Sequence, residues 1–425
     1  MLTLYSWVLR CLVPVFVLRL LWRSRHHRGY RRALAQRLGY RYPLAEPTTQ
    51  PRIWLHAVSV GETLAMAPLV ENLLITYPER RILITSTTPT GAEQVQRLFG
   101  ERVDRCWMPF DTPGAIRRFL GHWQPGILLL AETELWPNSV LQTRARQVPV
   151  VVLNARLSER SARGYARIRA LSQPVFSALT AVACQQQADA DRFQGLGTPA
   201  QQIRVVGSVK FDVTVAKLQA HAKALADELS LDVNRPYLMA ASTHPGEEAL
   251  VLEAFGKLRA YFSDLGLLLA PRHPNRTANV RKAAIDDGWR VVTRSSSTAF
   301  SASDDVLLID TLGELGAFTG LASVAFVGGS LVVHGGHNPL EAAGQGVPTV
   351  FGPHTFNFEV ICEQLLEVGA SQRVADVPSL VSALQRWLSV GDEVMQAGQA
   401  ARDFVAARTG ATERQIQWLG ELLAP

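Results

Sequence analysis

Residues 324–343 read VAFVGGSLVVHGGHNPLEAA and combine a short apolar run, two pairs of glycines and the start of a helix. Asn338 suits the N-cap of that helix, and Pro339 suits its first position. Glycines let the backbone approach a ligand closely, and a helix start offers unpaired N–H groups to a phosphate. Glu341 follows the cap by three residues, where it either closes a capping box or reaches the hydroxyls of a ribose. The stretch predicts a buried strand, a ligand-binding turn and a helix in direct succession.

Apolar runs of the same kind recur along the chain and alternate with helix-length segments. Such runs are typical of buried parallel strands in β-α-β units. They form two series joined by a polar helical stretch, which predicts an α/β protein with two Rossmann-like doubly wound domains facing across a cleft. Ligands of such folds collect beyond the carboxyl ends of the strands. The predicted strands are 52–58, 81–87, 126–131, 148–153 and 203–207, then 237–241, 266–270, 290–293, 306–309, 324–327 and 348–351.

The N-terminal stretch 2–22 reads LTLYSWVLRCLVPVFVLRLLW and is interrupted by Arg10, Pro14 and Arg19. As a helix it would be about 31 Å long, enough to cross the hydrocarbon core of a bilayer. The two arginines make full spanning costly, so spanning and lying in the interface both stay open. A soluble amphipathic helix packed on its own domain is the third alternative.

Charge is distributed unevenly along the chain. Residues 1–45 contain nine arginines and no acid, while the whole chain carries a net charge of +6, so the remainder carries −3. This pattern favours contact with an anionic membrane surface, with the following domains on the cytoplasmic side, and argues against a nucleic-acid-binding body. The four cysteines are scattered and form no C-x-x-C pair, so neither a disulfide framework nor a zinc site is expected.

The first series carries polar residues where its predicted strands end. In HAVSVGE, residues 56–62, Gly61 permits a tight turn and Glu62 then falls in the first turn of a helix, where the helix dipole keeps a carboxylate ionised. Such a carboxylate can accept a proton from a sugar hydroxyl, or it can merely stabilise its own helix start. Glu132 of ETELWPN can order a cation or a sugar, or belong to a capped loop. Arg156 of NARLS and Lys210 of GSVKFD suit an acidic sugar or a phosphate, although isolated cations are often only surface residues.

The second series has comparable turns before the glycine-rich one. Ser242 and Thr243 begin STHPGEE, which follows one predicted strand and opens a helix. Arg272 of PRHP follows the next strand and can make a charge-assisted contact with a nucleotide phosphate. Glu314 lies in TLGEL, after a third strand. Each turn is a weak signal alone, but together they predict a nucleotide site at the carboxyl ends of these strands.

Taken together, the segments HAVSVGE, ETELWPN, NARLS, GSVKFD, STHPGEE, PRHP, GGHNPLEAA and GPHTFNF resemble the Kdo transferase family, in the family's own order. That family transfers 3-deoxy-D-manno-octulosonic acid (Kdo) to a lipid A precursor, and its fold is the two-domain GT-B type. The resemblance implies an inverting glycosyltransferase of lipopolysaccharide synthesis that uses CMP-Kdo as donor and lipid IVA as acceptor. It also implies a place on the cytoplasmic face of the inner membrane of a Gram-negative bacterium. We predict no cofactor and no metal, because no acidic D-x-D-like cluster accompanies the nucleotide half.

The resemblance also implies roles for individual residues. Glu62 matches the general base, and Glu132 and Lys210 resemble the residues that stabilise the transition state. Possible further substrate contacts are Gly61, Arg156, Ser242 and Thr243. This chain has Leu312 where the family commonly has Met, a mild apolar change. The segments that look like CMP-binding ones comprise Pro271, Arg272, Leu312, Gly313, Glu314, Asn338, Pro339, Leu340 and Glu341.

Domain boundaries follow from these assignments. We predict a membrane anchor and basic arm over 1–45, an acceptor-binding domain over 46–213, a connector over 214–234, a CMP-sugar-binding domain over 235–400 and a C-terminal helix over 401–425. Two other functions fit parts of the sequence. One is a transferase or epimerase of the same fold that uses a UDP-sugar, and the other is a non-catalytic membrane-bound lipid carrier or scaffold.

Overall fold

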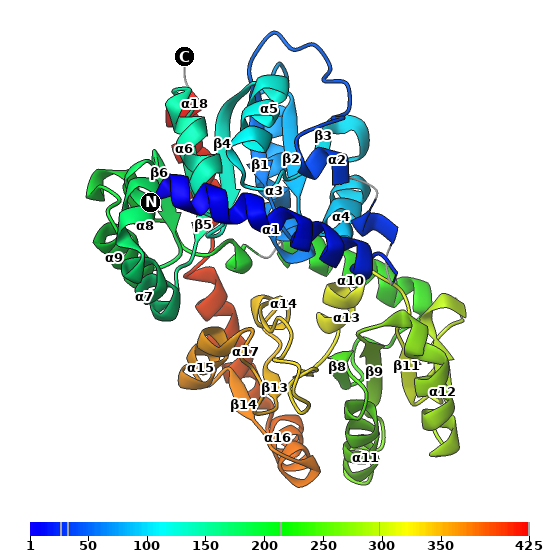
Figure 1. Cartoon of the computed structure of the whole chain (residues 1–425). Coiled ribbons are helices and arrows are strands. Elements are labelled where there is room, and N and C mark those ends of the chain that lie inside the picture. The colour runs from blue at the N-terminus through cyan, green and yellow to red at the C-terminus, as the bar shows by residue number, and fades with distance from the viewer. Residues whose placement is uncertain (26–27, 32–33, 213–214, 297, 424–425) are drawn as a thin grey trace. The chain divides into compact units, whose positions relative to one another are not determined.

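The computed structural model describes residues 1–425 apart from 26–27, 32–33, 213–214, 297 and 424–425. The chain divides into two compact units (Figure 1). The first comprises Met1–Asp212 and Gly410–Pro425, and the second comprises Val213–Thr409. Among the described residues, each unit holds a seven-stranded sheet in which all paired strands are parallel. This arrangement confirms the predicted pair of doubly wound α/β domains.

The first sheet has the strand order β3-β2-β1-β4-β5-β6-β7. Strand β1 lies inside the sheet and pairs with both β2 and β4, so that Ile53 lies opposite Ile82 on one side and Ile127 on the other. The direction of winding reverses between β1 and β4, which is where doubly wound sheets bind their ligands. The strands are β1 (Arg52–His56), β2 (Ile82–Ser86), β3 (Asp104–Trp107), β4 (Pro125–Ala131), β5 (Val150–Ala155), β6 (Ala181–Cys184) and β7 (Ile203–Val205).

The second sheet has the order β10-β11-β9-β8-β12-β13-β14, and its winding reverses between β8 and β12. The turns that follow these two strands therefore start next to each other, although the strands are far apart in sequence. The strands are β8 (Tyr237–Thr243), β9 (Gly266–Pro271), β10 (Val291–Thr293), β11 (Val306–Leu308), β12 (Val324–Val327), β13 (Thr349–Phe351) and β14 (Ser371–Arg373).

Helices cover both faces of each sheet, which explains why most strands are apolar throughout. The first unit contains α1 (Leu2–Arg23), α2 (Leu34–Arg37), α3 (Val60–Thr76), α4 (Pro89–Phe99), α5 (Pro113–Trp123), α6 (Pro137–Ala145), α7 (Glu159–Arg167), α8 (Arg169–Ser177), α9 (Gln187–Gly195) and α18 (Ala411–Leu423). The second contains α10 (Val215–Leu229), α11 (Glu247–Arg259), α12 (Thr277–Asp286), α13 (Leu315–Thr319), α14 (Leu340–Gly344), α15 (Glu359–Glu367), α16 (Val377–Ser389) and α17 (Gly391–Ala406).

Each predicted strand is present, with bounds that differ by a few residues. Three strands, β3, β6 and β14, escaped prediction. β3 and β14 are edge strands whose residues DRCW and SQR are partly polar, because an edge strand has a partner on one side only. The residues of β6, AVAC, are buried but small and carry little strand signal.

The ends of the two predicted domains are held by contacts that are remote in sequence. Helix α10 falls within the predicted connector 214–234, but it contributes four residues to the core of the second unit. Helix α18, within the predicted C-terminal helix 401–425, packs on α3 of the first unit. The Asp212 carboxylate fixes the start of α18 by accepting the backbone N–H groups of Gly410, Ala411 and Thr412 at 2.7, 3.2 and 2.6 Å.

Helix α1 is long and apolar enough to cross a membrane by length and composition. It nevertheless lies against the first unit along one side. Ser6 Oγ donates to Asn138 Oδ1 at 3.2 Å, and the ring of Phe16 stacks on that of Phe110 at 6.0 Å. The opposite side of the helix is exposed, and its apolar residues recur every three or four positions. This side is called the apolar face of α1 below. It consists of Leu4, Trp7, Val8, Leu12, Val15, Leu18, Leu21 and Trp22.

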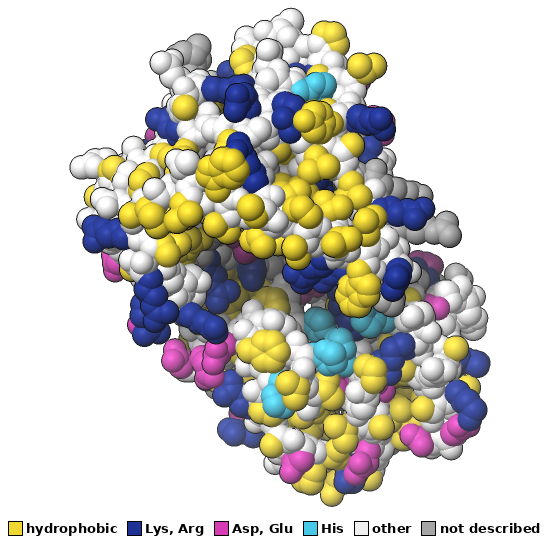
Figure 2. Space-filling model, in the orientation of Figure 1, with side chains coloured by type: hydrophobic (Ala, Val, Ile, Leu, Met, Phe, Trp, Pro, Cys, Tyr) yellow, Lys and Arg dark blue, Asp and Glu magenta, His cyan; other side chains and the backbone are white. Residues whose placement is uncertain are grey.

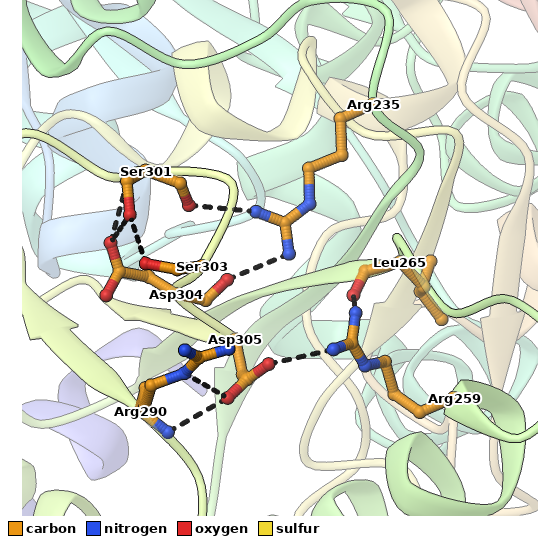
Figure 3. A network of polar contacts seen from close by, with 8 residues as sticks. All are labelled: Arg235, Arg259, Leu265, Arg290, Ser301, Ser303, Asp304 and Asp305. Carbon is orange, nitrogen blue, oxygen red and sulfur yellow. Dashed lines mark hydrogen bonds and ion pairs between the residues drawn. The ribbon is translucent and has the colours of Figure 1, made fainter.

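A network of arginines closes the second sheet at the amino ends of its strands (Figure 3). The buried Asp305 accepts Arg259 Nη2 at 3.0 Å and the backbone N–H of Arg290 at 3.1 Å. Arg235 donates to the backbone oxygens of Ser301 and Asp304 at 3.2 and 2.8 Å. Because these contacts lie at the end of the sheet opposite to the ligand-binding end, we assign them to stability.

Candidate active site

Glu62 lies at the start of α3, the helix that follows the interior strand β1. Ser59 is the N-cap, and its hydroxyl donates to Glu62 Oε1 at 2.8 Å. The backbone N–H of Val58 donates to Glu62 Oε2 at 2.8 Å. These contacts realise the predicted alternative in which Glu62 stabilises its own helix start. Each carboxylate oxygen can accept a further hydrogen bond, so the capping role does not exclude a second one.

The environment of Glu62 shifts the pKa of its carboxyl group. Burial raises the pKa of the Glu62 carboxyl, while the hydrogen bonds from Val58 and Ser59 act in the opposite direction. The negative charges of Glu132 and Glu134 raise this pKa further. The predicted influence of the helix start is thus present but is outweighed by burial.

Gly61 does not form the predicted tight turn. It lies within the first turn of α3 and its φ is not in the left-handed region, so the prediction for its backbone is wrong. A Cβ at this position would meet only Ser59 Oγ, at 3.9 Å. A side chain is therefore compatible with the helix at position 61.

Glu132 follows β4, the neighbour of β1, and has the left-handed φ of 58°. Its backbone N–H donates to Leu153 O at 2.9 Å, which holds this unfavourable conformation in place. Lys210 lies in the short helix Val209–Phe211 after β7. Burial lowers the pKa of Lys210, the charge of Glu132 raises it, and the charge of Arg156 lowers it. The charges of Glu132, Arg156 and Lys210 thus interact at the carboxyl end of the first sheet.

Two residues that the sequence analysis did not select belong to this cluster. Glu134 is half-buried, and burial and the charge of Glu132 raise its pKa, opposed by a hydrogen bond from Trp136. Asn154, fully buried with a φ of 51°, accepts the backbone N–H of Val209 at 3.3 Å. Asn154 therefore fixes the position of the Lys210 turn. Asparagine at a strand end was the available signal, since this residue tolerates left-handed backbone.

The second unit builds its turns around one carboxylate that the sequence analysis also did not select. Glu247, at the start of α11, has no exposed surface. Its two oxygens accept the backbone N–H groups of His244, Gly329, Ser330 and Leu331, at 2.9, 2.7, 3.0 and 2.9 Å. The turn after β8 and the glycine-rich turn after β12 are held together by this side chain. The acid pair in STHPGEE was its sequence signal.

Ser242 and Thr243, at the end of β8, explain one of the glycines. Ser242 has a left-handed φ of 56°, and a Cβ on Gly328 would approach its carbonyl oxygen to 2.4 Å. Gly328 is therefore required for the close contact between β8 and β12. Thr243 is fully buried, and its hydroxyl donates to Glu248 at 3.0 Å, so its side chain supports the turn from within.

Four histidines meet above these turns. His244 Nε2 lies 2.9 Å from His337 Nε2, and the His244 ring stacks on that of His334 with centroids 4.1 Å apart. His273 meets His244 edge to face. Burial, the charge of the nearby Arg272 and the other histidines together lower the pKa of His337 to about 4. Burial also lowers the pKa of His244, and Arg272 is exposed beside the cluster.

The stretch 338–341 provides an uncommitted carboxylate. Asn338 Oδ1 accepts the backbone N–H of Leu340 at 3.1 Å, as a cap does, and α14 begins at Leu340, one residue later than predicted. Glu341 closes no capping box. It is partly buried and has no hydrogen-bond partner among the described residues, and burial raises its pKa. Pro339 and Leu340 are buried, so contacts there would be through the backbone.

Glu314 differs from Glu341 because its side chain is engaged. Its oxygens accept Arg294 Nε and Nη2 at 3.1 and 2.9 Å, and Arg294 also pairs with Glu228 of α10. Burial raises the pKa of Glu314, but these hydrogen bonds outweigh it and the net direction is downward. Leu312, 68% exposed, and Gly313, with a φ of 91°, form the free part of this turn. Pro271 is buried at the end of β9.

The geometry offers no evident metal site. Within the described ranges, no group of three or more His, Cys, Asp or Glu side chains is arranged to hold an ion. The predicted site residues thus fall into an acid–base cluster in the first unit and a glycine-rich, histidine-rich cluster in the second. The cluster in the first unit suits proton transfer, and the cluster in the second unit suits anion binding.

Comparison with known proteins gives consistent results. Residues 32–213 match a family model described as 3-deoxy-D-manno-octulosonic-acid transferase. The 3-deoxy-D-manno-octulosonic acid transferase of Haemophilus influenzae is 38% identical over 92% of this chain and 91% of its own. That of Bordetella pertussis is 36% identical over 98% and 99%. A UDP-GlcNAc 2-epimerase from Neisseria meningitidis shares the fold, with 14% identity, a TM-score of 0.60, and coverage of 87% and 100%.

Proposed function

Since the chain belongs to the family of 3-deoxy-D-manno-octulosonic acid (Kdo) transferases, we propose that it moves Kdo from CMP-Kdo to lipid IVA with inversion. Transfer of a glycosyl group is the activity that the family name states. The donor, the acceptor, the stereochemistry and the residue roles are the proposal. The observation that carries the residue roles is the grouping of Glu62, Glu132 and Lys210 in one electrostatic cluster at the carboxyl end of the first sheet.

Glu62 is the general base in this proposal. Its raised pKa makes the carboxylate a stronger base than an exposed glutamate. The fixed hydrogen bonds from Val58 and Ser59 orient it, and its remaining lone pairs can accept the proton of the attacking sugar hydroxyl. Attack from the face opposite to CMP inverts the anomeric centre.

Two negative charges must be held during the reaction. The anomeric carbon of Kdo bears a carboxylate, and departing CMP bears a phosphate. Lys210, whose pKa is lowered by burial, and the exposed Arg272 supply positive charge for them. The negative charge of Glu132 raises the pKa of Lys210 and so favours its charged form.

The second unit would hold the nucleotide. Glu341 is available to accept ribose hydroxyls, and the backbone from Asn338 to Leu340 is fixed by its cap. The exposed turn at Leu312 and Gly313 is available to the base. Helix α1 and the arginines after it support attachment to the cytoplasmic face of the inner membrane, where a lipid acceptor resides.

The test is transfer itself. Purified protein is incubated with CMP-Kdo and lipid IVA, and the glycolipid product is weighed by mass spectrometry. Changing Glu62 to Ala should abolish the product and leave CMP binding intact, whereas Glu71→Ala, on the exposed side of the same helix, should remain active. Because Glu62 also caps α3, Glu62→Gln is made in parallel and its melting temperature is measured. Loss of CMP binding, or full activity of both variants, would contradict the proposal.

The second candidate is an enzyme of the same fold that uses a UDP-sugar. The reason to test it is that a UDP-GlcNAc 2-epimerase shares this fold. Thermal stabilisation by UDP and not by CMP would favour it.

A further inference from the structure

An apolar pocket opens in the first unit next to the acidic cluster. It encloses about 340 Å³ and lies between the ETELWPN turn, helices α7 and α8, and the N-terminal end of α1. Its wall includes Leu135, Leu171, Val175 and Phe176. Two large apolar side chains at its border are exposed, Trp136 at 42% and Ile168 at 46%. Apolar groups left open to solvent around a hollow are typical of a binding site.

The pocket lies beside the apolar face of α1. Tyr5 contributes to the pocket wall, and its hydroxyl donates to Asp111 at 3.0 Å. Leu4 and Val8, of the apolar face, are its neighbours on the helix. Since α1 is held against the unit from Tyr5 to Phe16, this face runs along the surface of the unit as a band of apolar side chains (Figure 2).

The polar end of the pocket adjoins the proposed active centre. Thr133 and Glu134 line it and follow Glu132 directly in the chain. The Thr133 hydroxyl donates to the backbone oxygen of Arg156, and Glu134 accepts Trp136 Nε1 at 2.9 Å. The pocket therefore has an apolar side along α8 and a polar end at Thr133 and Glu134.

Helix α7, which borders the pocket, carries positive charge on its exposed side. Helix α7, with no buried residue, carries Arg160, Arg163 and Arg167, whose spacing of three and four places them on one exposed face. Its one acid, Glu159, pairs with Arg163 at 3.6 Å in an exposed contact, which is worth little. Helix α7 continues through Ile168 at the border of the pocket into α8. Tyr165, through which α7 lines the pocket, follows Arg163 by two residues and therefore points to the opposite side of the helix from these arginines. The pocket itself is mainly apolar and fits an alkyl chain.

We propose that this pocket receives one acyl chain of the lipid acceptor, which its apolar wall and its place beside the apolar face of α1 suit. The inference rests on the proposed function for the identity of the acceptor. The apolar face of α1 lies in the same lipid surface, so that the chain passes from the bilayer to the pocket along α1 without crossing water.

The test fills the pocket. Leu171→Trp puts an indole into the hollow, and Ala170→Trp, on the exposed side of the same helix, is the matched control. Each protein transfers Kdo to lipid IVA and to its fully deacylated form. We expect Leu171→Trp to raise KM for lipid IVA at least about tenfold, equivalent to about 1.4 kcal/mol. Its KM for the deacylated form, its CMP affinity and its melting temperature should stay unchanged. Equal KM values for Leu171→Trp and Ala170→Trp with lipid IVA would overturn the inference.

A second measurement does not depend on catalysis. An anionic lipid with a diazirine in its acyl chain is bound to the full-length protein, and the labelled peptides are sequenced. Labelling should fall on residues 165–176 and be lost in Leu171→Trp. Labelling elsewhere overturns the pocket assignment. Absence of transfer by the wild type with labelling of the pocket instead contradicts the proposed function alone.

Discussion

Replacing Glu247 by glutamine exchanges one carboxylate oxygen for an NH2 group at a point where four backbone N–H groups converge. A glutamine oxygen can serve two of these donors, on one side of the group. The other two then face an NH2 group that cannot accept a hydrogen bond. Because Glu247 has no exposed surface, water cannot replace the missing acceptor.

The magnitude follows from the number of donors left without a partner. A buried polar group that loses its partner costs about 1–3 kcal/mol, so two of them predict a loss of about 2–6 kcal/mol in the free energy of unfolding. A typical domain has a stability of about 5–15 kcal/mol, so the second unit would be severely weakened. The turn at 328–331 also loses its fixed position, and CMP binding should weaken with it.

Urea denaturation followed by tryptophan fluorescence measures the loss, and calorimetric titration with CMP measures the binding. Glu253→Gln is the matched control, because it makes the same chemical change on an exposed side of α11 and breaks only a surface pair with Lys257. That control should change stability by less than about 0.5 kcal/mol. If Glu247→Gln unfolded at the same urea concentration as the control, the assigned role of this carboxylate would be wrong.

Three further predictions concern pH, the domain ends and metal. The base must be unprotonated, so transfer should fall as pH drops through the raised pKa of Glu62, and Glu134→Gln should move this fall to lower pH. An unmoved profile of kcat/KM against pH would count against the coupling. Asp212→Asn should cost about 1–2 kcal/mol in urea denaturation, through the cap of α18, while exposed Glu413→Gln should not. Transfer should proceed unchanged in EDTA, and recovery by added Mg²⁺ would disprove metal independence.

Much of the fold was accessible from local patterns. Strands such as β4 and β9 are buried on both faces, so their apolar runs stand out against the helices between them. The strands β3 and β14 were missed because an edge strand is paired on one side only. Their residues are therefore partly polar and do not form an apolar run. The prediction for Gly61 was wrong because the sequence does not distinguish a glycine at the start of a helix from a glycine in a tight turn.

The site was accessible as a set of positions and not as a set of contacts. Glu62, Glu132 and Lys210 each follow a strand, and the position of each was predictable from that. Their interaction depends on the pairing of β1 with β4 and on the position of the turn after β7. Glu134 and Glu247 stood inside quoted motifs, but their burial is what distinguishes them from surface acids.

The sequence alone determined most of the strands, the two doubly wound domains, the apolar N-terminal helix and the family, because each depends on residues close together along the chain. Only the tertiary structure decided that Glu247 joins two turns, that His244 meets His337, and that Tyr5 completes a pocket with α8. These contacts depend on which strands become neighbours and how helices cover them. That choice is made by burial of side chains over the whole unit, which no local stretch records.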